Sequence, residues 1–182
     1  LTSRNNLANA YREAGDLARA VPLLEQTLTD RLRVLGPDHP DTLRSRGSLA
    51  YVHSTAGDLA GAIPLLELTL ADMVRVLGPD HLDTLTSRNN LANAYREAGD
   101  LARAVPLLEQ TLTDRLRVLG PDYPDTLISR NNLALAYLQA GRRELGQQML
   151  EEAAADALRL FGPGHYVTRG VVENRDSARS AH

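Results

Sequence analysis

The sequence repeats itself with a period of 42 residues, and this period constrains the fold more than any other feature. When the chain is shifted by one period against itself, leucines, glycines and glutamates fall in register four times. They are Leu1, Leu43, Leu85 and Leu127, then Gly15, Gly57, Gly99 and Gly141, then Glu25, Glu67, Glu109 and Glu151. A fixed period of about 20 to 50 residues is typical of a solenoid, whose units bury their apolar faces only by stacking. The chain is therefore expected to be a stack of similar units.

Each unit has the pattern of two amphipathic helices. In residues 1–14, apolar side chains recur on one arc of a helical wheel and polar side chains on the opposite arc. Gly15 is suited to end this first helix in a left-handed conformation, and Asp16 to cap a second helix over about 17–35. A proline falls inside each of the first three second helices, at Pro22, Pro64 and Pro106. Because the apolar period continues across it, a kinked helix is favoured over a broken one.

The units are not equally alike. Residues 85–127 match residues 1–43 at every position except one, where His39 is replaced by Tyr123, so a two-unit block has been duplicated. We expect one domain made of repeats at about 1–39, 40–81, 82–123 and 124–164, with a polar terminal helix at about 165–178 that closes the stack. The chain begins in the middle of a repeat, which suggests a fragment of a longer protein.

Composition excludes several classes of function. The net charge is −3, and the 20 basic residues, all arginine, are scattered among acids, which disfavours a nucleic-acid partner. There is no cysteine, so disulfides and thiolate metal sites are excluded. No apolar run reaches the roughly 20 residues of a membrane span. These features predict a cytoplasmic protein without a membrane or nucleic-acid partner.

One charged position interrupts the apolar arc of every first helix. It is occupied by Arg4, Arg46, Arg88 and Arg130. A buried guanidinium needs a partner, and an aspartate recurs near the end of each second helix, at Asp30, Asp72, Asp114 and Asp156. Antiparallel packing of the two helices would bring these groups together. We therefore predict a repeated structural ion pair, in preference to four binding sites.

No catalytic or cofactor motif is present. The sequence has no phosphate-binding loop, no cysteine nucleophile and no metalloprotease motif, so an enzyme is not expected, nor any cofactor or metal. His39 lies between Asp38 and Asp41, which could suggest a metal site, but helix capping explains this histidine better. His53 stands where the first unit has Tyr11, which predicts a histidine within the core.

The residues resemble the tetratricopeptide repeat. The family's order of residues is met by Leu7, Ala8, Tyr11, Gly15, Ala20, Leu24 and Thr27. The usual repeat has 34 residues. The eight additional residues, and the Leu-Gly-Pro-Asp joint, resemble the longer variety found in kinesin light chains and in arrays attached to bacterial signalling ATPases. The resemblance implies an all-α, right-handed α-solenoid of four helix-turn-helix repeats plus a C-terminal capping helix, with the first helices lining a concave groove.

This arrangement implies that the polar arc of each first helix contacts a ligand. Asparagine both donates and accepts hydrogen bonds, so it can bracket an extended peptide backbone. The candidate peptide-binding residues are Asn5, Asn6, Asn9, Arg12, Ser48, Tyr51, Asn89, Asn90, Asn93, Arg96, Asn131, Asn132 and Leu135. In the fourth unit Ile128, Leu135 and Leu138 would form an apolar end of the groove, or core beneath the terminal helix.

Three functions agree with this pattern. The favoured one is a protein–protein interaction module that binds an extended peptide or a partner surface in its concave groove. The second is a sensory or autoinhibitory repeat array of a signalling ATPase. The third is a self-associating scaffold that uses its exposed terminal repeats.

Overall fold

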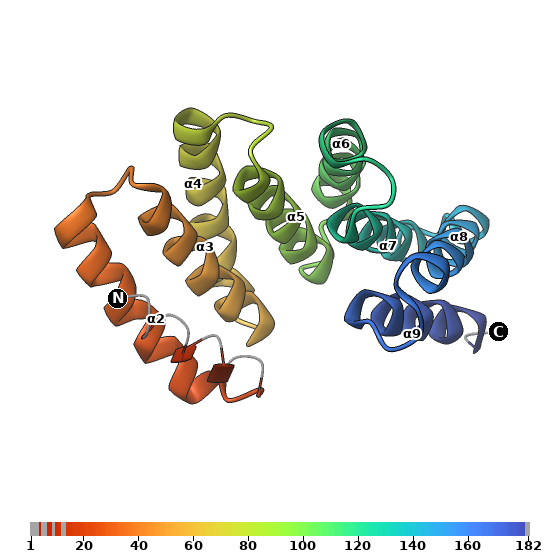
Figure 1. Cartoon of the computed structure of the whole chain (residues 1–182), viewed down its shortest axis with the longest axis horizontal. Coiled ribbons are helices and arrows are strands. Elements are labelled where there is room, and N and C mark those ends of the chain that lie inside the picture. The colour runs from red at the N-terminus through yellow and green to blue at the C-terminus, as the bar shows by residue number, and fades with distance from the viewer. Residues whose placement is uncertain (1–3, 5–6, 9, 12–13, 181–182) are drawn as a thin grey trace. The chain divides into compact units, whose positions relative to one another are not determined.

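The computed structural model describes residues 4, 7–8, 10–11 and 14–180, and all regular structure in these residues is helical (Figure 1). The helices are α2 (Leu17–Leu35), α3 (Pro40–Thr55), α4 (Leu59–Leu77), α5 (Leu82–Glu97), α6 (Leu101–Leu119), α7 (Pro124–Gln139), α8 (Arg143–Phe161) and α9 (Tyr166–Ser180). The prediction of an all-α chain of helix pairs is confirmed. The first predicted helix falls largely outside the described residues. No helix in the described part combines the length and apolarity needed to cross a membrane.

The second helices begin and end as the sequence predicts. Asp16 caps α2, its carboxylate accepting a hydrogen bond from the backbone N–H of Arg19, and Gly36 follows the helix with φ 86°. This positive φ is the reason for glycine, because a side chain strains the backbone there. α2 continues without interruption through Pro22, so the helix is not broken there, as predicted, while the predicted kink stays a prediction. In α8, Arg142 stands at the N-cap and makes no side-chain cap bond.

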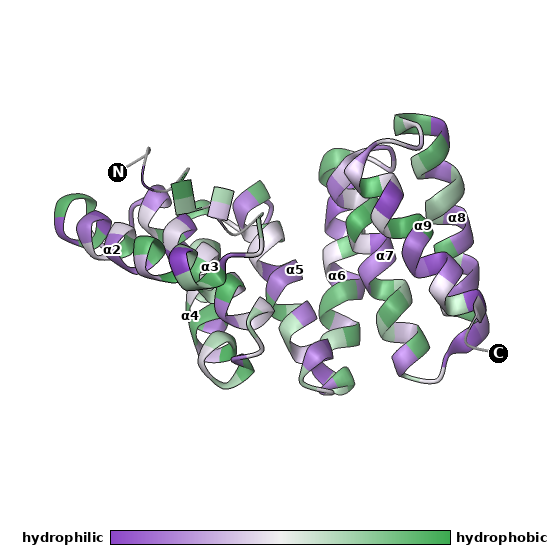
Figure 2. Ribbon diagram, turned by 90° about the horizontal axis from the view of Figure 1, so that it is seen from below, coloured by the Kyte–Doolittle hydropathy of each residue, from purple (hydrophilic) through white to green (hydrophobic). Residues whose placement is uncertain are grey.

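The chain forms two compact units, Leu1–Ala94 and Tyr95–His182. In the first unit α3 packs against α2 and α4, and in the second unit α7 packs against α6 and α8. Each helix in Figure 2 carries both hydrophobic and hydrophilic residues, as packing on one face requires. The organisation of the whole chain as one domain stays a prediction.

The same repeat positions supply the core of both units. Leu24, Leu66, Leu108 and Leu150 are all fully buried, as are Ala20, Ala62 and Ala104. Burial of one leucine side chain contributes about 1.5 to 3 kcal/mol. Each alanine precedes the leucine of its repeat by four residues, and its small side chain allows the two helices to approach closely. The regular spacing of these residues explains why each helix pair packs in the same way.

The terminal helix is confirmed close to its predicted position, as α9. Val167 and Val171 are buried in one cluster with Leu127 and with alanines of α8. The Asn174 side chain donates a hydrogen bond of 3.0 Å to Asn131 on α7. Thus α9 covers both helices of the fourth repeat, while its polar residues Arg169, Glu173 and Asp176 remain exposed.

Successive repeats differ in one buried residue of the second helix. Arg115 is 2 % exposed, and it donates hydrogen bonds to the Ser129 hydroxyl (2.8 Å) and to the Asp125 carbonyl (2.7 Å). Arg31 does the same with Ser45 and Asp41. In α4 this position is Met73, and the buried hydroxyl of Ser87 has no hydrogen-bond partner.

This difference predicts opposite effects for one substitution at two equivalent serines. Ser129→Ala removes an acceptor from the buried guanidinium of Arg115, so the free energy of unfolding should fall by about 1 to 2 kcal/mol. Ser87→Ala removes a hydroxyl without a partner, so stability should stay the same or rise by up to about 1 kcal/mol. Urea denaturation measures both changes. Equal losses in the two variants would contradict the assignment.

Candidate functional site

The structure describes nine of the thirteen predicted peptide-binding residues. Asn5, Asn6, Asn9 and Arg12 lie outside the described residues. Helix α3 carries Ser48 and Tyr51, α5 carries Asn89, Asn90, Asn93 and Arg96, and α7 carries Asn131, Asn132 and Leu135. Each group lies on one first helix, as predicted. The assignment of these residues to a binding site stays a prediction.

Two positions of the first helix are half-buried in every described repeat. One is occupied by Ser48, Asn90 and Asn132, and the other by Tyr51, Asn93 and Leu135. The two positions are three residues apart, so in each helix they lie on the same side. Their partial exposure leaves room for contact with a second molecule. The pair of residues on each of these helices is called its first-helix face below.

A third predicted position is buried. Asn89 is 6 % exposed and Asn131 is 8 % exposed. The side-chain oxygen of Asn131 accepts a hydrogen bond from Asn174 (3.0 Å), and its side-chain N–H donates to the side-chain oxygen of Asn132 (3.4 Å). In this position Asn131 joins α7 to α9. Helical periodicity in the sequence placed Asn131 on the exposed arc. Periodicity within one helix carries no information on a terminal helix that packs against it.

The apolar residues of the fourth repeat divide between core and surface. Ile128 packs against the cluster that α7, α8 and α9 share. Leu138 lies close to Gly146 of α8, where an added Cβ would be 2.8 Å from the leucine Cγ. Leu135 is half-buried on the first-helix face. Of the three, Ile128 therefore belongs to core under the terminal helix.

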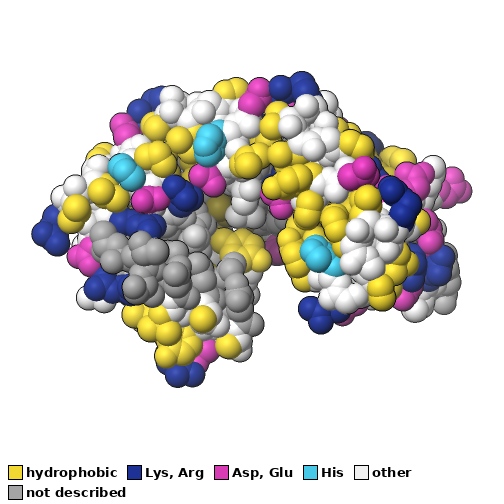
Figure 3. Space-filling view, viewed as in Figure 1, with side chains coloured by type: hydrophobic (Ala, Val, Ile, Leu, Met, Phe, Trp, Pro, Cys, Tyr) yellow, Lys and Arg dark blue, Asp and Glu magenta, His cyan; other side chains and the backbone are white. Residues whose placement is uncertain are grey.

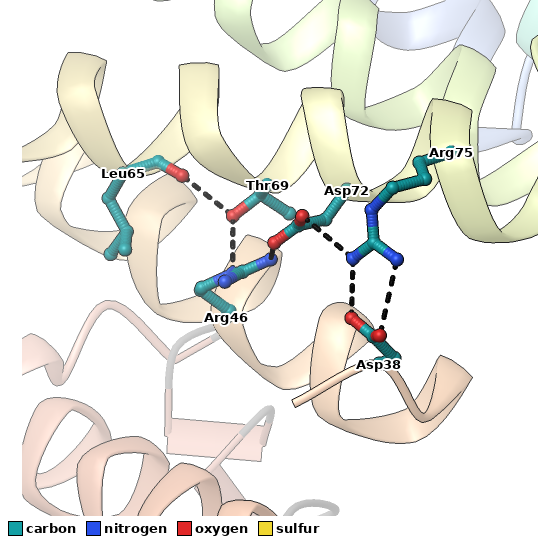
Figure 4. A network of polar contacts seen from close by, with 6 residues as sticks. All are labelled: Asp38, Arg46, Leu65, Thr69, Asp72 and Arg75. Atoms are coloured by element: carbon teal, nitrogen blue, oxygen red, sulfur yellow. Dashed lines mark hydrogen bonds and ion pairs between the residues drawn. The ribbon is translucent and has the colours of Figure 1, made fainter. Parts of the chain in front are cut away.

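Figure 4 shows the polar network that links α3 to α4. Arg46 donates to a carboxylate oxygen of Asp72 at 2.6 Å and to the Thr69 hydroxyl at 3.0 Å. Arg75 donates to the other oxygen of Asp72 at 3.1 Å and, in a fork, to Asp38 at 2.5 and 3.2 Å. Asp72 is thus held from two sides, and Arg75 extends the network to the preceding interhelical loop. The predicted ion pair is confirmed in this repeat.

The pair recurs in other repeats. Arg4 lies 2.6 Å from Asp30, and Arg130 lies 2.8 Å from Asp156. Arg88 is buried and donates to the Pro79 carbonyl at 3.4 Å. The ion pairs at the first, second and fourth repeats have the same spacing of 26 residues. They serve to join the two helices of a repeat, in agreement with a structural role.

The network lowers the pKa values of its carboxyl groups. The hydrogen bond from Arg46 lowers the pKa of Asp72, which Arg75 lowers further, although partial burial opposes both effects. The pKa of Asp156 is lowered by hydrogen bonds from Arg159 and Arg130. Asp38 in turn raises the pKa of Arg75. All of these shifts favour the charged forms.

These shifts predict acid sensitivity with a definite sign. A carboxyl group with a lower pKa in the folded state binds fewer protons there than in the unfolded chain. Its contribution to stability is complete above the unfolded pKa, about 3.9, and is lost as pH falls through the folded pKa. Unfolding followed by circular dichroism between about pH 6 and 2 should show this loss, and Asp72→Asn should reduce its slope. An equal slope in the variant would contradict the prediction.

The histidines of the interhelical joints cap helices. The Nδ1 atom of His39 accepts from the Asp41 backbone N–H at 3.1 Å, and His81 bonds Asp83 in the same way. The capping interpretation of His39 is confirmed. Tyr123, which replaces it in the duplicated unit, makes no such bond. Among the described residues no cluster of histidines and acids could hold a metal ion.

His53 departs from its predicted role. Its side chain is 29% exposed, with Nδ1 3.2 Å from an Asp58 carboxylate oxygen. The expectation of a core histidine is therefore wrong. The equivalent Tyr95 and Tyr137 are buried, whereas the equivalent Tyr11 is half-buried. The imidazole instead turns toward a carboxylate at the helix joint.

Sequence reasoning also missed contacts between tyrosines and arginines. The Arg103 guanidinium carbon lies 4.1 Å from the centre of the Tyr95 ring, and Arg19 lies over Tyr11 at 4.4 Å. Such contacts contribute about 0.5 to 1 kcal/mol at exposed sites. The repeated spacing of eight residues between the tyrosine and the arginine is visible in the sequence and could have revealed them.

An open pocket of 340 Å³ lies between α8 and α9. The Arg179 side chain donates to Glu151 there at 2.6 Å. The equivalent residues one repeat earlier are Tyr137 and Glu109, and the Tyr137 hydroxyl donates to Glu109 at 2.7 Å. Figure 3 shows acidic and basic side chains interspersed on the visible surface, without a field of one sign.

Comparison with known proteins agrees with this repeated geometry. Tetratricopeptide repeat profiles match residues 1–41 and 126–166, and residues 56–116. A search of curated proteins gives no match. A kinesin light chain-like protein of Podosopora anserina with nearly identical TPR-like repeats is 30% identical over 100% of this chain and 85% of that chain, with a TM-score of 0.80.

Two further solved structures share the fold at lower identity. BtubC (BKLC) from P. vanneervenii is 22% identical, with 96% of this chain and 70% of that chain covered and a TM-score of 0.77. The TPR2AB domain of yeast Sti1, in complex with pHSP90, is 14% identical over 98% and 69%, with a TM-score of 0.55. The predicted array of helix-turn-helix repeats with a terminal helix is confirmed. By profile, identity and fold together, this chain belongs to the tetratricopeptide repeat family.

Proposed function

We propose that the chain binds an extended peptide, or an extended segment of a protein partner, at the first-helix faces of its repeats. Tetratricopeptide repeats generally mediate protein–protein interaction, so the family supports an interaction module. The finer assignment rests on one observation: the same two positions are half-buried in α3, α5 and α7. Side chains at such positions can contact a ligand without giving up the packing of the repeat.

The chemistry of these positions favours recognition of a peptide backbone. Asn90 and Asn132 occupy one position, and Asn93 shares the other with Tyr51 and Leu135. An asparagine side chain can donate to a backbone carbonyl and accept from a backbone N–H, whatever the ligand sequence. Tyr51 and Leu135 would add apolar contacts that select side chains. In the yeast Sti1 structure the fold is in complex with pHSP90, which illustrates the use of this architecture for binding.

A peptide array followed by affinity measurement tests this proposal. The native chain should select peptides, and Asn90→Ala combined with Asn93→Ala should weaken their binding at least tenfold, about 1.4 kcal/mol for the lost hydrogen bonds. Gln110→Ala is the matched control, because it removes an exposed amide from the second helix α6. Fluorescence anisotropy gives the dissociation constants, and circular dichroism verifies folding. Unchanged affinity in the double variant would exclude the first-helix face as the binding surface.

A further inference from the structure

Helix α4 carries an apolar stripe on its solvent-exposed side. The stripe consists of Ala60, Pro64, Leu68, Ala71 and Val74, all exposed. Successive members are three or four residues apart, so they follow one line along the helix, over about 21 Å at 1.5 Å per residue. Leu68 is 52% exposed and Val74 is 40% exposed. The outward face of a surface helix is ordinarily polar, so this stripe requires a specific explanation.

The duplicated helices α2 and α6 share three positions of this stripe but not the other two. The shared positions are Ala18, Pro22 and Leu32 in α2 and Ala102, Pro106 and Leu116 in α6, all exposed. Where α4 has Leu68, helices α2 and α6 have Gln26 and Gln110, and where α4 has Ala71 they have Thr29 and Thr113. All four of these polar residues are exposed. The fold is therefore compatible with glutamine and threonine at both positions, and the apolar pair is particular to α4.

Two charged residues border the stripe in a symmetric arrangement. Glu67 and Arg75 are both exposed, and each is four residues from Ala71. Leu68 and Val74 are each three residues from Ala71. In an antiparallel helix pair related by a twofold axis, a residue before the axis in one helix faces the residue equally far after the axis in the other helix. A twofold axis at Ala71 thus places Leu68 beside Val74 and Glu67 beside Arg75.

We propose that this stripe is a self-association surface, on which α4 of one chain pairs antiparallel with α4 of a second copy about a twofold axis at Ala71. Leu68 of each copy then packs on Val74 of the other, and Glu67 faces Arg75 across the contact. The small side chain of Ala71 lets the helices approach closely at their crossing. This inference uses the opposite helix of the repeat from the proposed peptide site and does not depend on that site.

The size of the stripe determines how strong the dimer is. One helix face is smaller than the roughly 800 Å² per partner of a standard stable interface. The dimer is therefore weak, and monomer and dimer should be in equilibrium at protein concentrations of about 1 to 500 μM. Arg75 also retains its bonds to Asp38 and Asp72, so its pairing with Glu67 adds specificity rather than most of the affinity.

Sedimentation equilibrium tests the proposal with a variant taken from the chain's own repeats. The combined changes Leu68→Gln and Ala71→Thr give α4 the residues of α6 at these positions and should preserve the helical circular dichroism spectrum. The native chain should show a rising dimer fraction, and the variant's dissociation constant should be at least tenfold higher. A native chain that stays monomeric up to about 500 μM, or a variant that associates equally well, overturns the proposal.

Crosslinking tests the position of the axis. The chain has no cysteine, so Ala71→Cys introduces a single thiol at the proposed twofold axis. Two such thiols would face each other within the distance that a disulfide spans. Under mild oxidation this variant should form covalent dimer at least tenfold faster than Thr113→Cys, which places a thiol at the equivalent site of α6. Equal rates for the two variants overturn the assignment to α4.

Discussion

Replacing Asp72 by alanine is expected to lower the free energy of unfolding by about 2 to 3 kcal/mol. The change removes the carboxylate that Arg46 and Arg75 both contact, and it leaves the Arg46 guanidinium, whose side chain is only 14% exposed, without its ion-pair partner. Loss of one partner of a fully buried pair costs about 3 to 5 kcal/mol. The expected loss is smaller here because Asp72 is 22% exposed. Thermal or urea denaturation of the purified chain measures it.

Exchange of the two charges distinguishes an ion pair from independent effects. Arg46→Asp and Asp72→Arg should each destabilise the chain, and the double variant should recover part of the loss because the pair forms again in reverse. Recovery is incomplete because Arg75, 3.1 Å from Asp72 in the native chain, would then face a like charge. Losses that simply add would show that the two side chains do not interact.

Gly146→Ala is expected to destabilise the chain by about 1 kcal/mol, although alanine favours helices. An added Cβ would lie 2.8 Å from the Ala134 carbonyl oxygen and 2.8 Å from the Leu138 Cγ. Because one of these atoms belongs to the backbone of α7, the two helices would have to separate. Overpacking of this kind costs about 1 to 3 kcal/mol of stability. The gain in helix propensity, about 1 kcal/mol, does not offset this cost fully.

A second glycine provides the matched control. An added Cβ at Gly47 of α3 would meet its nearest atom, the Thr69 Cγ2, at 3.6 Å, an ordinary contact. Gly47→Ala should therefore raise stability by about 0.5 to 1 kcal/mol through helix propensity alone. Urea denaturation of both variants gives the comparison. A gain at both positions would mean that α7 and α8 have more space between them than the structure shows.

The neighbouring repeats explain why glycine is needed only in the fourth repeat. The position equivalent to Gly146 is alanine in the first three repeats, and it is fully buried in each of them. There the first helix has Ser54 or Arg96 where the fourth repeat has Leu138. A leucine directed toward the second helix thus fills the space that the alanine methyl group takes elsewhere. The two differences compensate each other, which a comparison of single positions does not reveal.

The sequence by itself determined the local structure of this protein. Its period identified the helix pairs, and its glycines, aspartates and prolines located the helix boundaries, because capping and left-handed turns depend on residues next to one another in the chain. The recurrence of Arg46 and Asp72 equivalents at a fixed spacing also predicted an ion pair, since regular repeats convert a sequence distance into a spatial one.

Only the tertiary structure decided which polar residues are open to a partner. Asn89 and Asn90 are adjacent and chemically identical, yet one is buried and the other half-exposed. His53 turns out of the core, and the apolar stripe of α4 remains exposed although its residues are as hydrophobic as buried ones. The physical reason is that exposure depends on every helix packed around a residue. Helical periodicity predicts the direction of a side chain, but it does not predict which neighbouring helix covers that side chain.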